Sequence, residues 1–503
     1  MSARIRLYNT LSRTIEPLET RESGKIGLYV CGMTVYDYCH IGHARAMMAF
    51  DFVVRHLRQR GYDVTFVRNH TDVDDKIIAR AKERGLDPLA LSATFVHALE
   101  EDLAALGILP PTRAPRVSEH IPDILELIAR LIAKGNAYRA DNGDVYFAVE
   151  SYPAYGHLSG KKLDDLRAGE RVAVDSAKRN PADFALWKAA TGDPVEPTWE
   201  SPWGRGRPGW HIECSAMARH YLGDTFDIHG GGIDLVFPHH ENEIAQSECG
   251  TGHGPYARYW MHNGHLTLPR PDEDGADDEK MSKSLGNVIR IRDILQEVPA
   301  EALRLYFAET QYRSPLPYAA DGLVRALGAL DRIYSAKETA LEVARATPTP
   351  VAELGDPAKE LYALAIGFPA AFNDAMDDDF NTAQALAALF ELVRAVNRFG
   401  NDKKARTKGA LAMVPVIAAF DLAADVLGIA AMEPQAFFDE VKQKRLAAAG
   451  KSLADIEARI LARTAARAAK DWAEADRLRA EFDAEGIVVM DNPTGCSWRM
   501  RIE

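Results

Sequence analysis

The sequence predicts an α/β fold built on a parallel sheet and followed by a large α-helical region. Three observations support this prediction: a strand–helix–strand unit near the N-terminus, the return of the α/β texture near Trp210, and a long Ala- and Leu-rich stretch with helical periods beyond Leu323. At 503 residues, the chain is long enough for several domains with well-buried cores. Ligands of parallel sheets collect beyond the carboxyl ends of the strands, so we expect the functional site at that edge.

The N-terminal unit begins with a short apolar run. Residues 26–30 predict a first strand, apolar side chains at close to helical spacing between Ala44 and Arg60 predict a helix, and residues 63–67 predict a second strand. Cys31 follows the first strand directly, and two histidines stand where the helix is expected to begin. These side chains are therefore expected at the carboxyl end of the sheet.

The rest of the chain changes texture twice. From about Pro115 to Trp203, Pro, Gly and polar residues separate short segments with strand-like pieces such as 144–149, which indicates an insertion. From about Glu433 we expect a long helix followed by the short apolar run 487–490. The predicted segments are the first half of the α/β domain (1–115), an inserted connective domain (116–203), the second half of the α/β domain (204–268), a linking region (269–322), a helical bundle (323–432) and a C-terminal domain (433–503).

Composition argues against export and membrane insertion. The N-terminal segment lacks the apolar core of a signal peptide, and the apolar stretch 410–432 is interrupted by Pro415, Asp421 and Asp425. The five cysteines are odd in number and far apart, so we expect reduced thiols in the cytoplasm rather than disulfides. The net charge of −13 would ordinarily disfavour a polyanionic partner, but it describes no single face or domain.

The HIGH sequence of His40–His43 stands where the first strand gives way to the helix. Its two imidazoles can donate to phosphate oxygens, and Gly42 lets a flat base approach the backbone. Taken alone, the pattern fits a turn without a ligand about equally well. A KMSKS sequence follows at 280–284, and its lysines, Lys280 and Lys283, can follow the charge that moves onto a departing pyrophosphate. The joint presence of both motifs favours nucleotide chemistry.

Together the two motifs resemble the signature sequences of class I aminoacyl-tRNA synthetases, which activate an amino acid with ATP. Longer blocks are similar to the cysteinyl-tRNA synthetase family: CGMTVYDYCHIGHAR from Cys31, RNHTDVDDKI from Arg68, KRNPADFALWK from Lys178, RPGWHIECSAM from Arg207 and DIHGGGIDLVFPHHENE from Asp227. The resemblance covers almost the whole chain in the expected order. It implies a Rossmann-type catalytic domain with an inserted acceptor-binding domain, a KMSKS loop and stem-contact region at 269–322, and an anticodon-binding domain at 433–503.

The resemblance implies the activity of a cysteine–tRNA ligase. L-Cysteine would be activated by ATP with Mg²⁺, and the cysteinyl group would pass to the 3′-terminal adenosine of tRNA(Cys), in a monomeric cytoplasmic enzyme. One alternative is a cysteine:amino-sugar ligase of thiol biosynthesis, which shares the zinc and ATP sites but lacks an anticodon domain. A second is a non-catalytic zinc- or RNA-binding scaffold. The tail beyond Glu433 argues against the first, and two complete ATP signatures argue against the second.

Four residues form a candidate zinc site. In the PHHENE sequence, His239 and Glu243 are four apart, on one face if Pro238 is the first residue of a helix. Adding the thiols of Cys31 and Cys214 gives a donor set that suits tetrahedral zinc. The family's zinc ligands fall on these four positions. One zinc ion per chain would select cysteine by preferring its ionised sulfur over the oxygen of serine, a near-isostere that a plain pocket rejects poorly.

Further roles come from carrying over the resemblance. Thr71 and Asp72 are expected to hold the substrate's ammonium, Trp210 to close over its side chain, and His229 to neighbour the zinc ligands. The glycines of HGGGID are expected to let the backbone approach a nucleotide, and Asp234 to accept from ribose hydroxyls. These glycines are Gly230, Gly231 and Gly232.

The tail is the less acidic part of the chain. Residues 441–503 carry 12 Lys/Arg and 10 Asp/Glu, a net charge of +2 against −15 for the rest. Within it, four cations are spaced as one helix face that could contact phosphates, although a merely solvated face fits equally well. These cations are Arg459, Arg463, Arg467 and Lys470. The final residues offer Asp491, Trp498 and Arg499 for contacts with unpaired bases.

Overall fold

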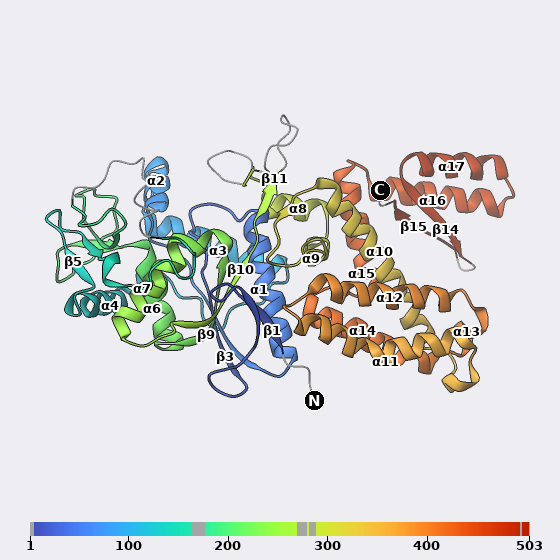
Figure 1. Ribbon diagram of the computed structural model, residues 1–503. Helices are drawn as coiled ribbons and strands as arrows, with labels where there is room; N and C mark the ends of the chain where they lie inside the picture. Colours follow the sequence, from blue (N-terminus) through green and yellow to red (C-terminus); the bar gives the residue numbers. More distant parts are fainter. Residues whose placement is uncertain (1–4, 163–176, 269–278, 281–287, 493–494, 502–503) are drawn as a thin grey trace.

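The fold consists of an α/β half and a helical half. The computed structural model describes residues 5–162, 177–268, 279–280, 288–492 and 495–501 (Figure 1). The α/β half lies on the left of Figure 1 and the helical bundle on the right, with the C-terminal domain above the bundle. This arrangement confirms the predicted fold class.

A four-stranded parallel sheet forms the centre of the α/β half. Its strands lie in the order β10-β9-β3-β4, and Leu28 of β3 is paired with Ile228 of β9 and Phe66 of β4. The strand bounds are β3 (Lys25–Val30), β4 (Asp63–Arg68), β9 (Phe226–Gly232) and β10 (Ala257–Asn263). Helix α1 (Ile41–Gln59) connects β3 to β4 and buries Met48, Val54 and other apolar residues. The strand–helix–strand prediction is therefore confirmed, with the helix beginning three residues earlier than its apolar spacing indicates.

The insertion between the two halves of the parallel sheet carries a sheet of its own. This sheet is antiparallel, in the order β5-β6-β7-β8, so the expected strand at 144–149 is present as β6. The bounds are β5 (Ala137–Arg139), β6 (Val145–Phe147), β7 (Phe184–Ala189) and β8 (Gly206–Pro208). The helices around the two sheets are α2 (Asp75–Arg84), α3 (Pro88–Ala105), α4 (Ile121–Ala133), α6 (Trp210–Leu222) and α7 (Glu241–Thr251). Short strands complete this half: β1 (Arg6–Asn9), β2 (Thr14–Pro17), β11 (Leu266–Leu268), β12 (Glu279–Lys280) and β13 (Leu316–Pro317).

The helical half packs against α1. Its helices are α8 (Ile291–Glu297), α9 (Ala300–Ala308), α10 (Ala320–Val343), α11 (Asp356–Asp377), α12 (Thr382–Gly400), α13 (Lys403–Lys408) and α14 (Ala410–Leu427). Among the described residues, α14 alone is long and apolar enough to cross a membrane, and half of it is buried in the protein. It contacts α1, α10 and α11, as a core helix of a bundle does. Ion pairs fasten the helical half to the α/β half, and buried Arg304 of α9 donates to Asp51 of α1 over 2.6 Å.

The C-terminal domain corrects one prediction. In place of a single long helix, it has α15 (Pro434–Ala448), α16 (Leu453–Ala468) and α17 (Trp472–Ala484), followed by the hairpin β14 (Ile487–Asn492) and β15 (Gly495–Met500). Gly450 (φ +63°) and Lys470 (φ +60°) adopt left-handed backbone conformations that end the first two helices. The side chains of Ser452 and Asp471 then cap the next two.

Replacement of Gly32 by alanine is expected to destabilise the sheet edge that carries the site. A Cβ at Gly32 would lie 1.6 Å from the carbonyl oxygen of Asn69, at the end of the neighbouring strand. Because backbone must move to relieve this overlap, the free energy of unfolding should fall by about 3 kcal/mol or more, as measured by urea denaturation. The matched control is Gly367→Ala in α11, where a Cβ meets nothing within 4 Å. That variant should gain about 0.5–1 kcal/mol, and equal stability of the two variants would contradict the expected clash.

Candidate functional site

A cavity of about 310 Å³ opens at the carboxyl ends of β3 and β9. Predicted residues from three separate blocks of sequence line it together. Those lining it are Cys31, His40, Gly42, His43, Trp210, Gly232 and Asp234. The parallel sheet therefore brings the nucleotide signature and one of the candidate metal ligands to a single edge, as expected for this topology.

The two signature histidines cap α1. The backbone N–H of His43 donates to Nδ1 of His40 (3.3 Å), and the backbone N–H of His40 donates to Nδ1 of His43 (3.4 Å). The two rings stack with centroids 3.5 Å apart. Because both Nδ1 atoms accept, the neutral imidazoles carry their protons on Nε2. Each ring is thus prepared as an Nε2–H donor for an anion at the helix N-terminus.

The four candidate zinc ligands converge beneath this cavity. Cys31 follows β3, Cys214 lies in α6, His239 in the π turn η4 (Val236–His240), and Glu243 in α7. The two Sγ atoms are 3.6 Å apart, and Oε1 of Glu243 lies 3.4 Å from Sγ of Cys31 and 3.1 Å from Nε2 of His239. All four side chains are buried, and the four ligand atoms lie within 4.8 Å of one another. Two thiols, one imidazole and one carboxylate in this geometry fit zinc.

A shell of further histidines surrounds these four residues. Nε2 of His229 lies 2.9 Å from Oε2 of Glu243, and Nδ1 of His211 lies 3.0 Å from Nδ1 of His239. His240 reaches Sγ of Cys31 with Nε2 (3.4 Å) and contacts His262 with Nδ1 (2.8 Å). Cys31, His229, His240 and Glu243 form an overlapping second group with metal-ligand spacing, but it has one thiol instead of two.

Sequence reasoning identified only His229 among these neighbours. His211 stands beside Trp210 in the WHIEC segment and His262 near the end of β10. His211 is three residues before Cys214, one turn along α6, a spacing that could have identified it, whereas His262 is far from every candidate ligand in sequence and gave no signal. We interpret the shell as support that fixes ring orientation around the candidate ligands.

The electrostatics of the cluster favour a cation. Burial, followed by the contact with Cys214, raises the pKa of the Cys31 thiol well above its ordinary value, whereas the hydrogen bond from Cys31 lowers the pKa of Cys214 to about 6. Although burial opposes both shifts, the charges of His229 and His239 hold the pKa of Glu243 far below its usual range, and Glu243 and Cys214 raise the pKa of His239 to about 10. These shifts favour positive charge on the ring of His239 beside the two acidic groups, and a divalent ion bound by the four residues would supply such charge instead.

The predicted substrate residues differ in their access to the cavity. Trp210 is 39% exposed and stacks on His239 with ring centroids 4.4 Å apart, between the cavity and the buried ligands. Thr71 and Asp72 are buried at the end of β4 and do not line the cavity. The carboxylate of Asp72 accepts from the backbone and the hydroxyl of Ser118, the latter over 2.5 Å. An ammonium held by Asp72 would have to compete with Ser118.

Only one of the three predicted nucleotide glycines lines the cavity. A Cβ at Gly230 would lie 2.3 Å from the ring of Phe50, and a Cβ at Gly231 would lie 2.9 Å from the ring of His240. These two glycines therefore let α1 and His240 pack against β9. Gly232 and the exposed Asp234 face the cavity itself. In the KMSKS sequence, Lys280 is described only as the end of strand β12, and residues 281–287, including Lys283, lie outside the described residues.

The C-terminal domain takes part of the predicted basic face into ion pairs within the protein. The side chain of Arg463 is 2% exposed and makes a bidentate ion pair with Asp491 (2.7 and 3.0 Å). Asp491 also pairs with Arg467. Arg459 pairs likewise with Glu485. Arg467 stays 41% exposed, and Lys470 is exposed just beyond the end of α16, so acids from outside the helix take up only part of the predicted face.

The predicted base-contacting residues are also occupied within the protein. Trp498 is buried in the small core of the domain, under the ammonium of Lys442. The guanidinium of Arg499 lies 3.6 Å over the ring of Phe438 and donates to Glu338 of α10. Asp491, Trp498 and Arg499 therefore hold the hairpin to its neighbours.

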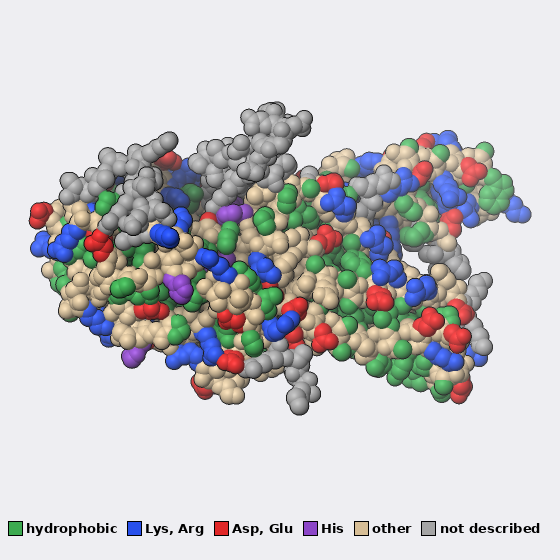
Figure 2. Space-filling model, viewed as in Figure 1, with side chains coloured by type: hydrophobic (Ala, Val, Ile, Leu, Met, Phe, Trp, Pro, Cys, Tyr) green, Lys and Arg blue, Asp and Glu red, His purple; other side chains and the backbone are tan. Residues whose placement is uncertain are grey.

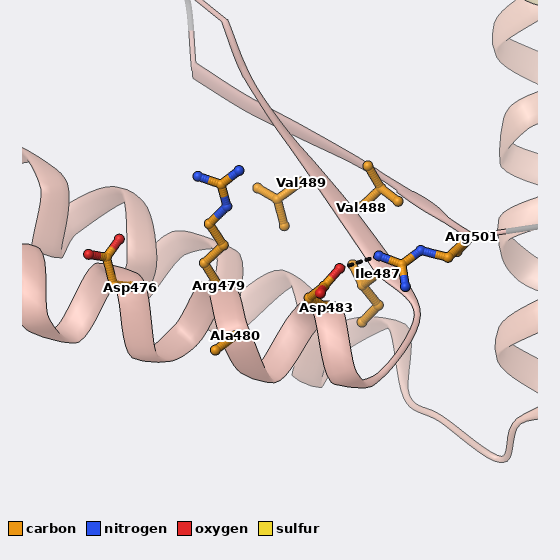
Figure 3. Close-up of a pocket in the computed structure, with 8 residues that line it drawn as sticks. All are labelled: Asp476, Arg479, Ala480, Asp483, Ile487, Val488, Val489 and Arg501. Atoms are coloured by element: carbon orange, nitrogen blue, oxygen red, sulfur yellow. Dashed lines mark hydrogen bonds and ion pairs between the residues drawn. The ribbon is translucent and has the colours of Figure 1, made fainter.

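Another surface of the C-terminal domain is open. A groove of about 360 Å³ lies between α17 and β14, where Arg479 points toward Val489 and Asp483 pairs with Arg501 (Figure 3). In the space-filling view, Lys and Arg side chains gather over the C-terminal domain and the adjoining edge of the bundle (Figure 2). Arg467 and Lys470 are also exposed in this domain, so a polyanion would meet them as well as these side chains.

Replacement of Asp491 by asparagine is expected to loosen the C-terminal domain. The change removes the charge that balances buried Arg463, so the free energy of unfolding of this domain should fall by about 1–3 kcal/mol in calorimetry. Glu457→Gln, at an exposed position of α16, is the matched control and should stay within about 0.5 kcal/mol of the parent. Equal melting of both variants would show that the pair with Arg463 contributes nothing.

Comparisons with known proteins agree with this architecture. Residues 17–328 match the family model of the class I (C) tRNA synthetase catalytic domain, residues 371–431 a DALR domain, and residues 453–499 the cysteinyl-tRNA ligase anticodon binding domain. The chain is 52% identical to the cysteine–tRNA ligase of Alkalilimnicola ehrlichii and 50% identical to that of Methylococcus capsulatus, over 98% of this chain and 99% of each relative.

A solved structure shows the same fold at low identity. Mycobacterium tuberculosis methionyl-tRNA synthetase in complex with methionyl-adenylate superposes with a TM-score of 0.63 at 18% identity. The match covers 84% of this chain and 96% of that one. At this identity, the likeness concerns the fold alone.

Proposed function

The chain belongs to the cysteine–tRNA ligase family of class I tRNA synthetases, and from this premise we propose how its own residues carry out the reaction. The protein activates L-cysteine with ATP and transfers the cysteinyl group to tRNA. The alternative cysteine:amino-sugar ligase is not supported, because residues 453–499 match the anticodon binding domain. Two steps need explanation: how cysteine is chosen and how the adenylate forms.

The choice of cysteine is assigned to the buried cluster. Cys31, Cys214, His239 and Glu243 would hold one zinc ion, since two thiols and an ionised carboxylate already lie within 4.8 Å of one another. Zinc held there would supply a soft Lewis acid that favours an ionised sulfur over a hydroxyl or a methyl group. Trp210, stacked on His239 at the cavity wall, would cover the substrate side chain. His229 and Tyr256 hold the carboxylate of Glu243 in place.

Adenylate formation is assigned to the helix N-terminus of α1. The substrate carboxylate attacks the α-phosphorus of ATP in line, and pyrophosphate leaves. His40 and His43 donate from Nε2 to phosphate oxygens, where negative charge grows in the transition state. Lys280 and Lys283 would follow the charge onto the pyrophosphate, and Asp234 at the cavity rim would accept from the ribose. Mg²⁺ would enter with ATP.

The tRNA is expected to contact both ends of the molecule. The insertion is assigned to the acceptor end and the C-terminal domain to the anticodon, which its family model matches. The terminal adenosine then takes the cysteinyl group from the adenylate. We further propose that the enzyme acts as a cytoplasmic monomer. Gel filtration tests this, and elution as a larger assembly would contradict it.

The observation that carries the proposal is the buried Cys–Cys–His–Glu cluster directly beside the capping histidines. The test is cysteine-dependent ATP–pyrophosphate exchange, followed by charging of tRNA(Cys) and of an amino sugar in parallel. We expect exchange with cysteine, none above background with serine, and charging of tRNA alone. Exchange followed by modification of the sugar would contradict the transfer step, and absence of exchange would contradict activation.

A further inference from the structure

A second group of metal-binding side chains lies outside the catalytic cavity. His120 directly precedes α4, and Asp123 lies in the first turn of that helix. His220 and Tyr221 lie in the last turn of α6, the helix that also carries Cys214. The group therefore joins the first helix of the insertion to a helix of the candidate zinc site.

The geometry of this group matches a three-residue metal site. Nδ1 of His120 lies 3.0 Å from one oxygen of Asp123, and Nδ1 of His220 lies 3.0 Å from the other. The ligand atoms of all three residues lie within 4.8 Å of one another. Ligands that each sit about 2.0–2.1 Å from a tetrahedral ion lie roughly 3.3 Å apart, so little movement is needed to admit one.

The surroundings suit an open site. The His120 side chain is 7% exposed and touches the hydroxyl of Tyr221 with Nε2 (3.1 Å), which fixes the ring with Nδ1 toward Asp123. Asp123 is 28% and His220 45% exposed, so an ion can enter from solvent and keep water as its remaining ligand. The hydrogen bonds from the two histidines lower the pKa of Asp123 against the effect of its burial, which keeps the carboxylate ionised.

We propose that His120, Asp123 and His220 form a second metal site, for a divalent transition ion of the zinc class, which clamps α4 to α6. Two imidazoles and a carboxylate prefer such ions over Mg²⁺ or Ca²⁺, which seek oxygen ligands. On binding, the proton of each neutral ring shifts from Nδ1 to Nε2, so Nδ1 donates its lone pair to the ion and Nε2–H of His120 donates to the Tyr221 hydroxyl. The competing arrangement is the same trio held only by hydrogen bonds, and a metal titration separates the two.

The test uses the full chain with the candidate zinc site beside the catalytic cavity disabled by removal of its two thiols. In the Cys31→Ser/Cys214→Ser protein, stripped of metal by a chelator, Zn²⁺ is titrated by calorimetry and counted by atomic emission. We expect one ion per chain, and its loss when His220→Ala or Asp123→Asn is added. Tyr221→Phe should weaken binding about 10-fold, because it removes the partner of His120 but no ligand.

The control histidine is His97 of α3, which is exposed and lies 3.3 Å from Glu101. His97→Ala should leave the titration unchanged. Failure of the double-serine protein to bind zinc would overturn the proposal, and so would undiminished binding after either ligand change. Circular dichroism verifies folding of each variant, and Asp123→Asn replaces His220→Ala if the latter unfolds. Because both thiols are absent throughout and the expected loss of binding is tied to His220 and Asp123, the result does not depend on the proposed zinc site.

Discussion

Replacement of Cys214 by serine is expected to abolish cysteine activation while ATP still binds. The change removes the thiol with the lowered pKa from a cluster in which Cys31, His239 and Glu243 lie within 4.8 Å of it. A serine hydroxyl is a poor zinc ligand, so the variant should bind about one zinc ion per chain fewer than the parent. Cysteine-dependent ATP–pyrophosphate exchange should fall about 10³-fold or more, equivalent to roughly 4 kcal/mol of transition-state stabilisation.

The matched control is Cys249→Ser. Cys249 is a half-buried free cysteine of α7 and belongs to neither of the candidate metal groups around Glu243. Its zinc content, exchange rate and melting temperature should stay close to those of the parent. Unchanged cysteine affinity in Cys214→Ser, measured by equilibrium dialysis, would contradict the role assigned to the cluster. Lost ATP affinity would show instead that the cavity had collapsed.

Replacement of His40 by asparagine is expected to slow adenylate formation without undoing α1. Asparagine is a good N-cap residue, so its side-chain oxygen can still accept the backbone N–H of His43. The Nε2–H donor is lost, and removal of one such donor from a charge-stabilising site typically costs about 10²–10³ in rate. The rate constant for ATP–pyrophosphate exchange should fall by this factor, with the KM for cysteine nearly unchanged.

The companion variant His40→Ala separates capping from chemistry. It loses both the donor and the cap, so it should be slow and also less stable than His40→Asn by about 1 kcal/mol in urea denaturation. His43→Asn should resemble His40→Asn in rate, because the two rings stack and face the same cavity. Full activity in both asparagine variants would remove the histidines from the proposed mechanism.

Local patterns predicted the elements that support the site. Strand β3, helix α1 and strand β4 lie within three residues of their predicted ends, since apolar spacing and turn residues act over a few positions. The C-terminal region was predicted less well. Helical periodicity continues across Gly450 and Lys470, but left-handed backbone at these residues divides one expected helix into three.

Sequence by itself determined the family, the class of fold and the candidate ligands, because signature motifs combine residue types whose chemistry does not depend on distant neighbours. Tertiary structure alone decided which of these groups meet. It brings Cys31 and Cys214 to 3.6 Å across 183 positions, surrounds Glu243 with histidines, and pairs arginines of the expected basic face of α16 with Asp491 and Glu485. The physical reason is that periodicity identifies the face of an element, whereas packing between elements far apart in the chain selects what that face contacts.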